Sequence, residues 1–411
     1  MPDLDLLVIG GGAAGFFGAL AAAEARPGLR VLVLEQGAQP LAKVKISGGG
    51  RCNVTTSITD PAVLVAWYPR GSRELRGPFT RFGPADTMAW FEARGVRLKT
   101  EPDGRVFPVS DESQTVIDCL LAGARRLGVG WQVKAGARTL EKVEKGFAVE
   151  ASGGQRWTAR QVLLAPGGGS AAAYRLAAGL GHTIVPPVPS LFTFNIKDAR
   201  LEGLAGVSVV AAHLRLAAHN ERFEAAGPLL VTHWGLSGPA VLRLSAWGAR
   251  ALAAEGHTGQ LQINWLGEAK TEDVLEQLLA EKQAHPRQQT AKHNPLGGMP
   301  ARLWARLVVL SGIPETQTWA DISNKTLRTL AGELTAGEYA VQGKGIFKEE
   351  FVTAGGVNLK EVDFRTMHSR VCPGLSLAGE ILDIDGLTGG FNFQSAWTTG
   401  WLAGQAAATG E

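Results

Sequence analysis

Short apolar runs alternate with segments of helical spacing over the first 185 residues of the chain. Residues 4–9 and 31–35 are apolar runs typical of buried parallel strands, and the second run ends in an acid. Between them, small residues at about 13–25 predict a helix. The pattern then predicts helices at 87–94 and 114–127 and strands at 130–135, 146–150 and 162–165, with a charged segment joining the first two of these strands. This alternation predicts an α/β fold with a parallel sheet.

The pattern changes at residues 185–189, where three prolines fall within four positions and indicate a boundary. Strand-like runs at 192–195 and 207–216 then predict a small β unit, and helical spacing dominates 271–337. Glycine-rich sequence returns near 352, and a strand is predicted at 375–378. If that strand completes the sheet that begins at residue 4, the first domain is discontinuous and the middle of the chain is an insertion.

Composition narrows the class of protein. A chain of 411 residues predicts two or three domains, and 45% hydrophobic with 19% charged residues is ordinary for a globular protein. The net charge of +3, with mixed signs, is too weak to indicate nucleic-acid binding. Cys52, Cys119 and Cys372 form neither a disulfide framework nor a metal-ligand cluster. We therefore expect a cytoplasmic protein without a metal site, signal peptide or membrane span.

The run from Gly10 to Gly15 follows the first strand and opens the first helix, in the spacing G-x-G-x-x-G. Gly10 allows a tight turn, Gly12 lets the backbone approach a pyrophosphate, and Gly15 lets helix and strand pack closely. The helix N-terminus offers N–H groups to phosphates, and Glu35 ends the second strand, where it can bind ribose hydroxyls. This fingerprint predicts dinucleotide binding, with FAD and NAD both open.

Two further glycine runs bear on that choice. Residues 47–53 place three glycines beside Arg51, which would let the chain pass flat against a ring system; an ordinary flexible loop explains the run equally well. Residues 386–394 open a helix that continues to about 408, and such a helix start would stabilise a reduced flavin. This favours FAD. The pair Gly400 and Gly404 predicts close helix packing.

These motifs identify a family resemblance. The chain resembles the HI0933-like FAD-binding flavoproteins, also called the BaiN-type or aminoacetone-oxidase-like family. The blocks that carry the resemblance are VIGGGAAG at 8–15, KISGGGRCNVT at 45–55, THWGLSGPAVL at 232–242, the segment 351–394 and AWTTGWLAG at 396–404. The resemblance implies an FAD-dependent oxidoreductase with a glutathione-reductase-type, Rossmann-like FAD domain at 1–186 and 346–411. It further implies a β-barrel-like insert at 187–268 and a helical subdomain at 269–345.

The resemblance also implies the cofactor contacts. The pyrophosphate loop would be Gly10, Gly12, Ala13, Ala14 and Gly15. Glu35 would bind the adenosine ribose beside Gln36, Lys43 would lie near the adenosine side, and Ala137 would face adenine. The flavin would be lined by Ser47, Gly48, Gly49, Arg51, Cys52 and Asn53. The ribityl and pyrophosphate portion would meet Gly379 and Glu380. Asp385 belongs to the same block. Ala165 and Gly167, at the end of another strand of the sheet, would also bind the cofactor. The flavin pyrimidine edge would meet Gly390, Phe391 and Asn392. After Ser170 the chain departs from the family pattern, because a helix follows almost directly where a longer loop is usual.

No side-chain nucleophile is required, since flavin chemistry takes place at N5 of the ring. Arg51, Cys52 and His233 are therefore weak catalytic candidates. Arg51 could balance the flavin's charge or bind an acidic substrate. Cys52 could be a redox thiol or a packing residue. His233 could be a proton donor or a structural histidine.

We expect a small organic substrate above the flavin, at the junction with residues 187–345. Two reactions stay open, an NAD(P)H-linked reduction of an unsaturated or carbonyl compound and an amine oxidation that passes electrons to oxygen. A flavin-bearing nucleic-acid-binding or regulatory protein, with 271–337 as its contact surface, is the alternative class. The oligomeric state is left open by the sequence.

Overall fold

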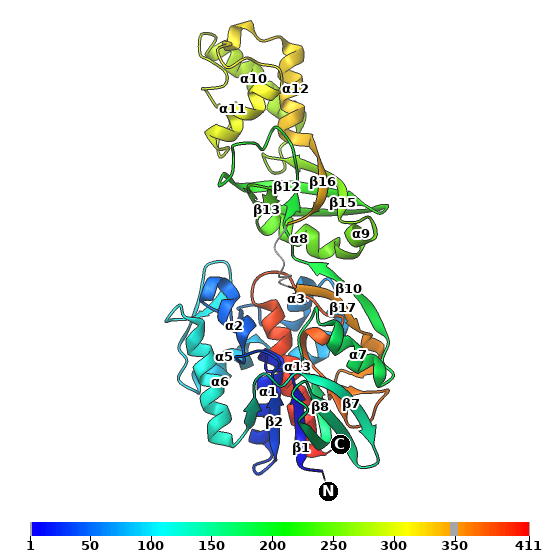
Figure 1. Ribbon diagram of the computed structural model, residues 1–411. Coiled ribbons are helices and arrows are strands. Elements are labelled where there is room, and N and C mark those ends of the chain that lie inside the picture. The colour runs from blue at the N-terminus through cyan, green and yellow to red at the C-terminus, as the bar shows by residue number, and fades with distance from the viewer. Residues whose placement is uncertain (1, 346–351, 411) are drawn as a thin grey trace. The chain divides into compact units, whose positions relative to one another are not determined.

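The computed structural model describes residues 2–345 and 352–410, which divide into two compact units (Figure 1). Unit 1 combines Met1–Pro187 with Val352–Glu411, and unit 2 is Val188–Phe351. Unit 2 is thus an insertion in the sequence of unit 1, and the prolines at 186, 187 and 189 lie at the first crossing.

Unit 1 is built on a parallel sheet whose strands come from both ends of the chain. Its central order is β20-β9-β1-β2-β6, and all neighbours in this run are parallel. The strand bounds are β1 Leu4–Ile9, β2 Val31–Leu34, β6 Gly130–Gln132, β9 Arg156–Leu164 and β20 Leu375–Leu377. Short strands β18 (Val362–Asp363) and β19 (His368–Ser369) extend the sheet beyond β20. The predicted α/β fold, with a C-terminal strand completing the first sheet, is confirmed.

One segment of this sheet differs from the prediction. The charged segment after residue 135 is a strand, β7 (Ala137–Val143), which forms a hairpin with β8 (Gly146–Ala151). β8 then pairs antiparallel with the first half of β9. Leu140 is the one buried side chain of β7, so the apolar alternation that identifies a strand is missing from its sequence.

Helices α1 (Ala13–Ala25) and α13 (Phe391–Thr409) pack closely through small residues. A Cβ on Gly404 would lie 2.2 Å from the carbonyl oxygen of Gly18, and one on Gly400 would lie 2.4 Å from that of Ala14. The predicted packing role of this glycine pair is confirmed. Among residues 2–345 and 352–410, no helix is long and apolar enough to cross a membrane.

The remaining elements of unit 1 surround this core. α6 (Ser113–Leu127) packs on α1 and ends at Gly128 in the left-handed conformation, with φ +70°. A second sheet has the order β3-β5-β4, and β10 pairs with β17. The other bounds are α2 Ala42–Ile46, β3 Thr55–Thr56, α3 Pro61–Leu64, α4 Ser72–Arg81, α5 Pro84–Glu92, β4 Leu98–Thr100, β5 Arg105–Pro108, α7 Ala171–Gly179, β10 Ile184–Ser190 and β17 Val352–Val357.

Unit 2 contains a closed six-stranded barrel of order β11-β14-β13-β12-β15-β16 and a group of helices. The barrel strands are β11 Phe194–Asn195, β12 Ser208–Ala218, β13 Glu221–Val231, β14 Gly235–Ser237, β15 Thr258–Asn264 and β16 Gly337–Lys344. The helices are α8 Pro239–Trp247, α9 Ala249–Ala254, α10 Thr271–Ala284, α11 Ala301–Leu310 and α12 Asn324–Ala336.

Two barrel strands depart from the sequence expectation. β13 is not among the predicted strands, because Gly227 and Pro228 interrupt its apolar pattern. The range 269–345, predicted as helical, ends in strand β16, which pairs with β15 and β11. Tyr339 and Val341 alternate with exposed residues there, so the barrel core selects a strand directly after α12. The helical part therefore stops at Ala336.

Candidate cofactor site

The glycine loop between β1 and α1 has one position that packing inside the protein does not explain. Gly10 has φ +114°, and a Cβ there would lie 2.2 Å from the carbonyl oxygen of Ala165. A Cβ on Gly15 would lie 1.9 Å from the carbonyl oxygen of Gly10. At Gly12, by contrast, φ is −92° and a Cβ would meet no atom within 4 Å. Gly12 thus leaves open space at the N-terminus of α1, where an anion is stabilised.

Glu35 closes one side of this loop. Its Oε2 accepts a hydrogen bond from the Gly11 N–H at 2.9 Å, and its Oε1 accepts one from the Gly37 N–H at 2.6 Å. Gln36 lies beside the start of β7, since a Cβ on Gly136 would be 2.9 Å from Cβ of Gln36. Glu35, Gln36 and the start of β7 at Ala137, three of the positions expected on the adenosine side, therefore lie close together. Their contact with a nucleotide stays a prediction.

Lys43 is paired with an acid from the other end of the chain. Its Nζ forms an ion pair with Glu380 Oε2 at 2.9 Å, and its expected place near the adenosine stays a prediction. The same carboxylate accepts hydrogen bonds from the N–H groups of Gly168, at 3.1 Å, and Thr353, at 3.0 Å. Gly167 lies next to both partners, with its Cβ position 3.9 Å from each. The ion pair holds Lys43, which lies on α2, next to the turn after β9. Through the Glu380 carboxylate, α2, that turn and β17 are thus connected.

The glycine run at 47–53 has an open backbone at two of its positions. Gly48, Gly49 and Gly50 have φ between +57° and +86°, and a Cβ on Gly49 or Gly50 would meet no atom within 4 Å. The side chain of Ile46 beside them is 57% exposed. A flat ring could therefore approach this backbone, as the sequence predicts.

Cys52 is a poor redox candidate. Its side chain is fully buried, and that burial raises the pKa of the thiol to about 12. The thiol is neutral at physiological pH, and nucleophilic attack requires the thiolate. All three cysteines are free. Packing within the loop is the role that the surroundings of Cys52 support.

The start of α13 is connected to the same loop. In the amide orientation that satisfies its neighbours, the side-chain oxygen of Asn53 accepts from the Gly390 N–H at 2.9 Å and its nitrogen donates to the Thr55 carbonyl at 2.9 Å. A Cβ on Gly390 would lie 2.4 Å from that Thr55 oxygen. The Gly390 N–H, which the resemblance places at the flavin, is hydrogen-bonded to Asn53, and its contact with a flavin stays a prediction.

The next two residues are also engaged by the protein. The Asn392 side chain binds both the N–H and the carbonyl of Gly386 at 2.8 Å. The Phe391 ring stacks on Trp67 with centroids 5.0 Å apart, and its carbonyl accepts from the Tyr68 hydroxyl at 2.6 Å. The side chains at 391 and 392 thus shape the turn before α13, and a contact with flavin would have to come from their backbone.

Asp385 is a structural residue in this arrangement. Its side chain is fully buried and forms an ion pair with Arg70, whose side chain is 10% exposed. The Asp385 carboxylate thus forms a buried pair next to the N-terminus of α4, and its predicted place among the cofactor-binding residues stays a prediction. Arg70 was not identified in the sequence, because 315 residues separate the partners and no local motif marks them.

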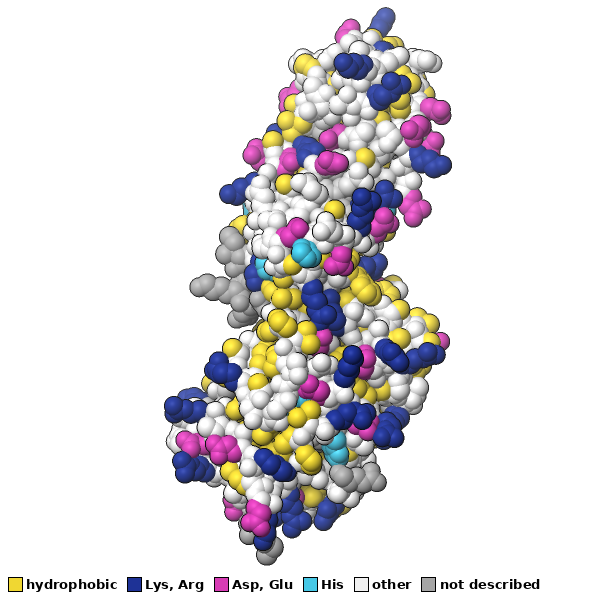
Figure 2. Space-filling view, turned by 90° about the vertical axis from the view of Figure 1, so that its right-hand side faces the viewer, with side chains coloured by type: hydrophobic (Ala, Val, Ile, Leu, Met, Phe, Trp, Pro, Cys, Tyr) yellow, Lys and Arg dark blue, Asp and Glu magenta, His cyan; other side chains and the backbone are white. Residues whose placement is uncertain are grey.

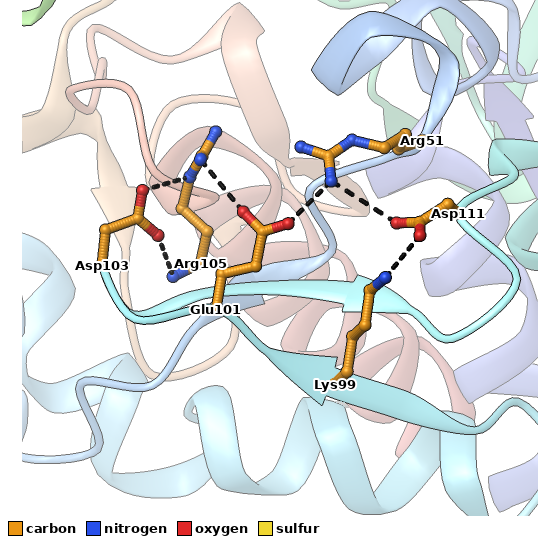
Figure 3. Close-up of polar contacts among 6 residues, drawn as sticks. All are labelled: Arg51, Lys99, Glu101, Asp103, Arg105 and Asp111. Carbon is orange, nitrogen blue, oxygen red and sulfur yellow. Dashed lines mark hydrogen bonds and ion pairs between the residues drawn. The ribbon is translucent and has the colours of Figure 1, made fainter.

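Arg51 belongs to a charge network on β4, β5 and the following turn (Figure 3). Its Nη1 lies 2.7 Å from Glu101 Oε1 and 3.4 Å from Asp111 Oδ1, while Lys99 and Arg105 pair with the same two acids. The Glu101 carboxylate, followed by that of Asp111, raises the pKa of the Arg51 guanidinium. The guanidinium also lies 3.9 Å from the centre of the Phe107 ring. Two carboxylates already compensate this cation, which weakens its case as a partner for a reduced flavin.

His233 and Ser170 both lie next to turns of the chain. His233 is exposed in the turn between β13 and β14 of unit 2, beside a Trp234 side chain that is 42% exposed. Both of its expected roles, as a proton donor or as a structural histidine, stay predictions. Ser170 caps α7 by accepting from the Ala173 N–H at 3.3 Å, so the helix does start directly after this residue.

Comparisons with known proteins agree with this architecture. Residues 4–406 match the family model described as the HI0933-like protein Rossmann domain. The chain is 32% identical to 3-dehydro-bile acid delta(4,6)-reductase of Clostridium scindens, over 98% of each chain. It is 30% identical to ribosomal RNA dihydrouridine synthase of Escherichia coli over 98% of each chain, and 27% identical to that of Haemophilus influenzae over 96%.

Solved flavoenzyme structures share the fold. The chain superposes with a TM-score of 0.51 on 3-ketosteroid-delta4-(5alpha)-dehydrogenase of Rhodococcus jostii, at 16% identity and with 98% and 96% of the two chains covered. The TM-score is also 0.51 for 3-ketosteroid delta1-dehydrogenase of Sterolibacterium denitrificans, at 14% identity over 99% and 100%. At such identities the likeness concerns the fold alone.

Proposed function

The chain belongs to the HI0933-like family of FAD-dependent oxidoreductases, and we propose that it reduces a carbon–carbon double bond conjugated to a carbonyl group. The observation that carries the proposal is the chemistry shared by the names of its relatives. A 3-dehydro-bile acid with double bonds at positions 4 and 6 is a conjugated ketone. Dihydrouridine is uridine whose ring double bond, next to a carbonyl, has been reduced. Both reactions deliver a hydride and a proton to such a bond.

The residues of unit 1 fit FAD. The open space at Gly12 and the N-terminus of α1 would accept the pyrophosphate, and Glu35 would accept hydrogen bonds from ribose hydroxyls. The backbone of Gly49 and Gly50, where a Cβ would meet no atom within 4 Å, would allow the ring to lie close. When bound, FAD supplies the hydride transfer itself. The protein's part is then to hold the ring, to exclude water and to position the substrate.

We further propose NAD(P)H as the electron donor. Across the cycle, NAD(P)H is oxidised to NAD(P)⁺, the carbon β to the carbonyl gains a hydride, and the α carbon gains a proton from solvent or a side chain. This balances two electrons and two hydrogens without oxygen. Amine oxidation, the other reaction left open by the sequence, needs oxygen as acceptor and would release peroxide.

The net charge of the chain and its similarity to the named relatives together support a substrate class. A net charge of +3 and the interspersed Lys, Arg, Asp and Glu on the face drawn in Figure 2 favour a small conjugated ketone over a polyanion. The two relatives named as ribosomal RNA dihydrouridine synthases make a uracil base in ribosomal RNA the second candidate. Both candidates present the same reacting group, so one assay can compare them.

The experiment is an anaerobic half-reaction series on the purified, FAD-loaded protein. We expect NADPH or NADH to bleach the flavin absorbance, and a conjugated steroid ketone to restore it with a mass gain of two hydrogens in the substrate. Restoration by ribosomal RNA, with dihydrouridine found after digestion, would identify the second candidate. Bleaching by aminoacetone, with peroxide formed on admitting air and no response to NAD(P)H, would overturn the reductase proposal.

A further inference from the structure

A cluster of one carboxylate and two imidazoles lies in unit 2, whereas the residues assigned to the cofactor belong to unit 1. Glu281 and His285 are one helical turn apart at the end of α10, and His293 is in the following loop. One ligand atom from each residue lies within 4.8 Å of the other two. Glu281 Oε1 is 2.6 Å from His293 Nε2 and 3.5 Å from His285 Nε2. Among the described residues this is the group with metal-ligand geometry.

The distances suit a small divalent metal. With bonds of about 2.0–2.2 Å and tetrahedral angles, ligand atoms around zinc are roughly 3.4 Å apart. The observed contacts lie on both sides of this value, so small side-chain rotations would bring the three atoms to one ion. The side chains of Glu281, His293 and His285 are 16%, 32% and 45% exposed, which leaves room for water as a fourth ligand. Two imidazoles and one carboxylate are a ligand set that zinc and related transition metals prefer.

The loop that carries His293 is held in place by the rest of the helical region. The Thr290 N–H donates to the Gln317 carbonyl at 3.0 Å, and its own carbonyl accepts from Trp304 Nε1 at 2.8 Å. The Trp319 N–H donates to the Gln288 carbonyl at 3.0 Å. The side-chain amide of Gln288 also lies 3.4 Å from Nδ1 of His285, where a partner fixes the orientation of a ligating imidazole. The cluster is thus largely formed before any ion binds.

We propose that Glu281, His285 and His293 bind a divalent transition metal, zinc by ligand preference. The ion would connect the end of α10 to the loop before α11 and so stabilise the helical region of unit 2. The ordinary alternative is a hydrogen-bonded Glu–His pair without metal affinity. The cysteines of the chain take no part in this site. The sequence signal is an acid and a histidine four residues apart, Glu281 and His285. The third ligand, His293, is brought beside them by the fold.

The test is metal titration of the full-length, FAD-loaded protein after treatment with a chelator. Co²⁺ serves as the probe because its visible absorption reports nitrogen and oxygen coordination, and Zn²⁺ is measured by competition. We expect one equivalent to bind and to raise the melting temperature. His293→Ala and Glu281→Gln should each weaken binding at least a hundredfold. His285→Gln, at the most exposed ligand, should also weaken it and is the variant least able to disturb folding.

The matched control is His219→Ala, which removes a histidine of the same unit whose Nδ1 lies 3.8 Å from Glu255 Oε1. This variant should bind like the parent protein. FAD content and the metal-free melting temperature establish that each variant is folded. The proposal is overturned if the parent protein takes up neither Co²⁺ nor Zn²⁺ at micromolar concentration. It is equally overturned if folded His285→Gln and His293→Ala variants bind as tightly as the parent.

Discussion

Replacing Gly12 and Gly15 by alanine separates cofactor contact from folding. At Gly12 the backbone conformation suits alanine and a Cβ would meet no atom within 4 Å, so the free energy of unfolding of the FAD-free protein should fall by less than about 1 kcal/mol, mainly through the helix cap. At Gly15 a Cβ would lie 1.9 Å from the carbonyl oxygen of Gly10. A backbone oxygen cannot rotate away, so this variant should lose about 1–3 kcal/mol or more without any cofactor.

FAD affinity should show a different order. A methyl group at Gly12 projects where the pyrophosphate is expected, and an overlap worth about 1–3 kcal/mol weakens binding about 5- to 150-fold. Urea unfolding of the FAD-free proteins gives the first quantity, and fluorescence titration with FAD gives the second. Gly12→Ala with the parent affinity for FAD would refute our placement of the pyrophosphate. Equal loss of stability in both variants would refute the claim that Gly12 faces open space.

Three further variants or treatments test the packing and the buried groups. Asp385→Asn should destabilise unit 1 by about 3–5 kcal/mol in urea unfolding, since it removes the buried negative charge that is paired with Arg70; a change below 1 kcal/mol would contradict the pair. Cys52 should resist iodoacetamide at pH 8 in the folded protein, because a thiol whose pKa is raised to about 12 stays protonated there, and rapid alkylation detected by mass spectrometry would speak against its burial. Gly404→Ala should lower the melting temperature, whereas Gly332→Ala in α12, where a Cβ meets no atom within 4 Å, should raise stability by about 0.5–1 kcal/mol; the same sign for both would contradict the helix contact.

The part of the fold that follows from local pattern could be predicted from the sequence. β1, α1 and β2 are each identified by their own residues, and the fingerprint connects them without any distant partner. β7 could not be predicted in the same way, because it faces solvent along most of its length and carries charges instead of an apolar alternation. The residues of β16 were assigned to the helical region for a related reason. A strand that closes a barrel is defined by its neighbours, here β11 and β15.

The candidate site shows the same limit more sharply. The glycine positions were predictable because tight turns and close approaches restrict the backbone to glycine. The polar partners were not: Lys43 with Glu380, Arg70 with Asp385 and Asn53 with Gly390 each join residues more than 300 positions apart. These side chains join distant segments of unit 1, and their predicted contacts with the cofactor stay predictions. Glycine positions follow from local backbone geometry, whereas polar partners so far apart in the sequence do not.

The central claim is that the bound flavin delivers a hydride to a carbon–carbon double bond conjugated to a carbonyl. The direct measurement is to reduce the FAD-loaded protein without oxygen, add a conjugated steroid ketone and follow flavin absorbance together with substrate mass. The account predicts that the oxidised flavin spectrum returns as the substrate gains two hydrogens. A flavin that stays reduced with both the ketone and ribosomal RNA, and is reoxidised by oxygen alone, would contradict it.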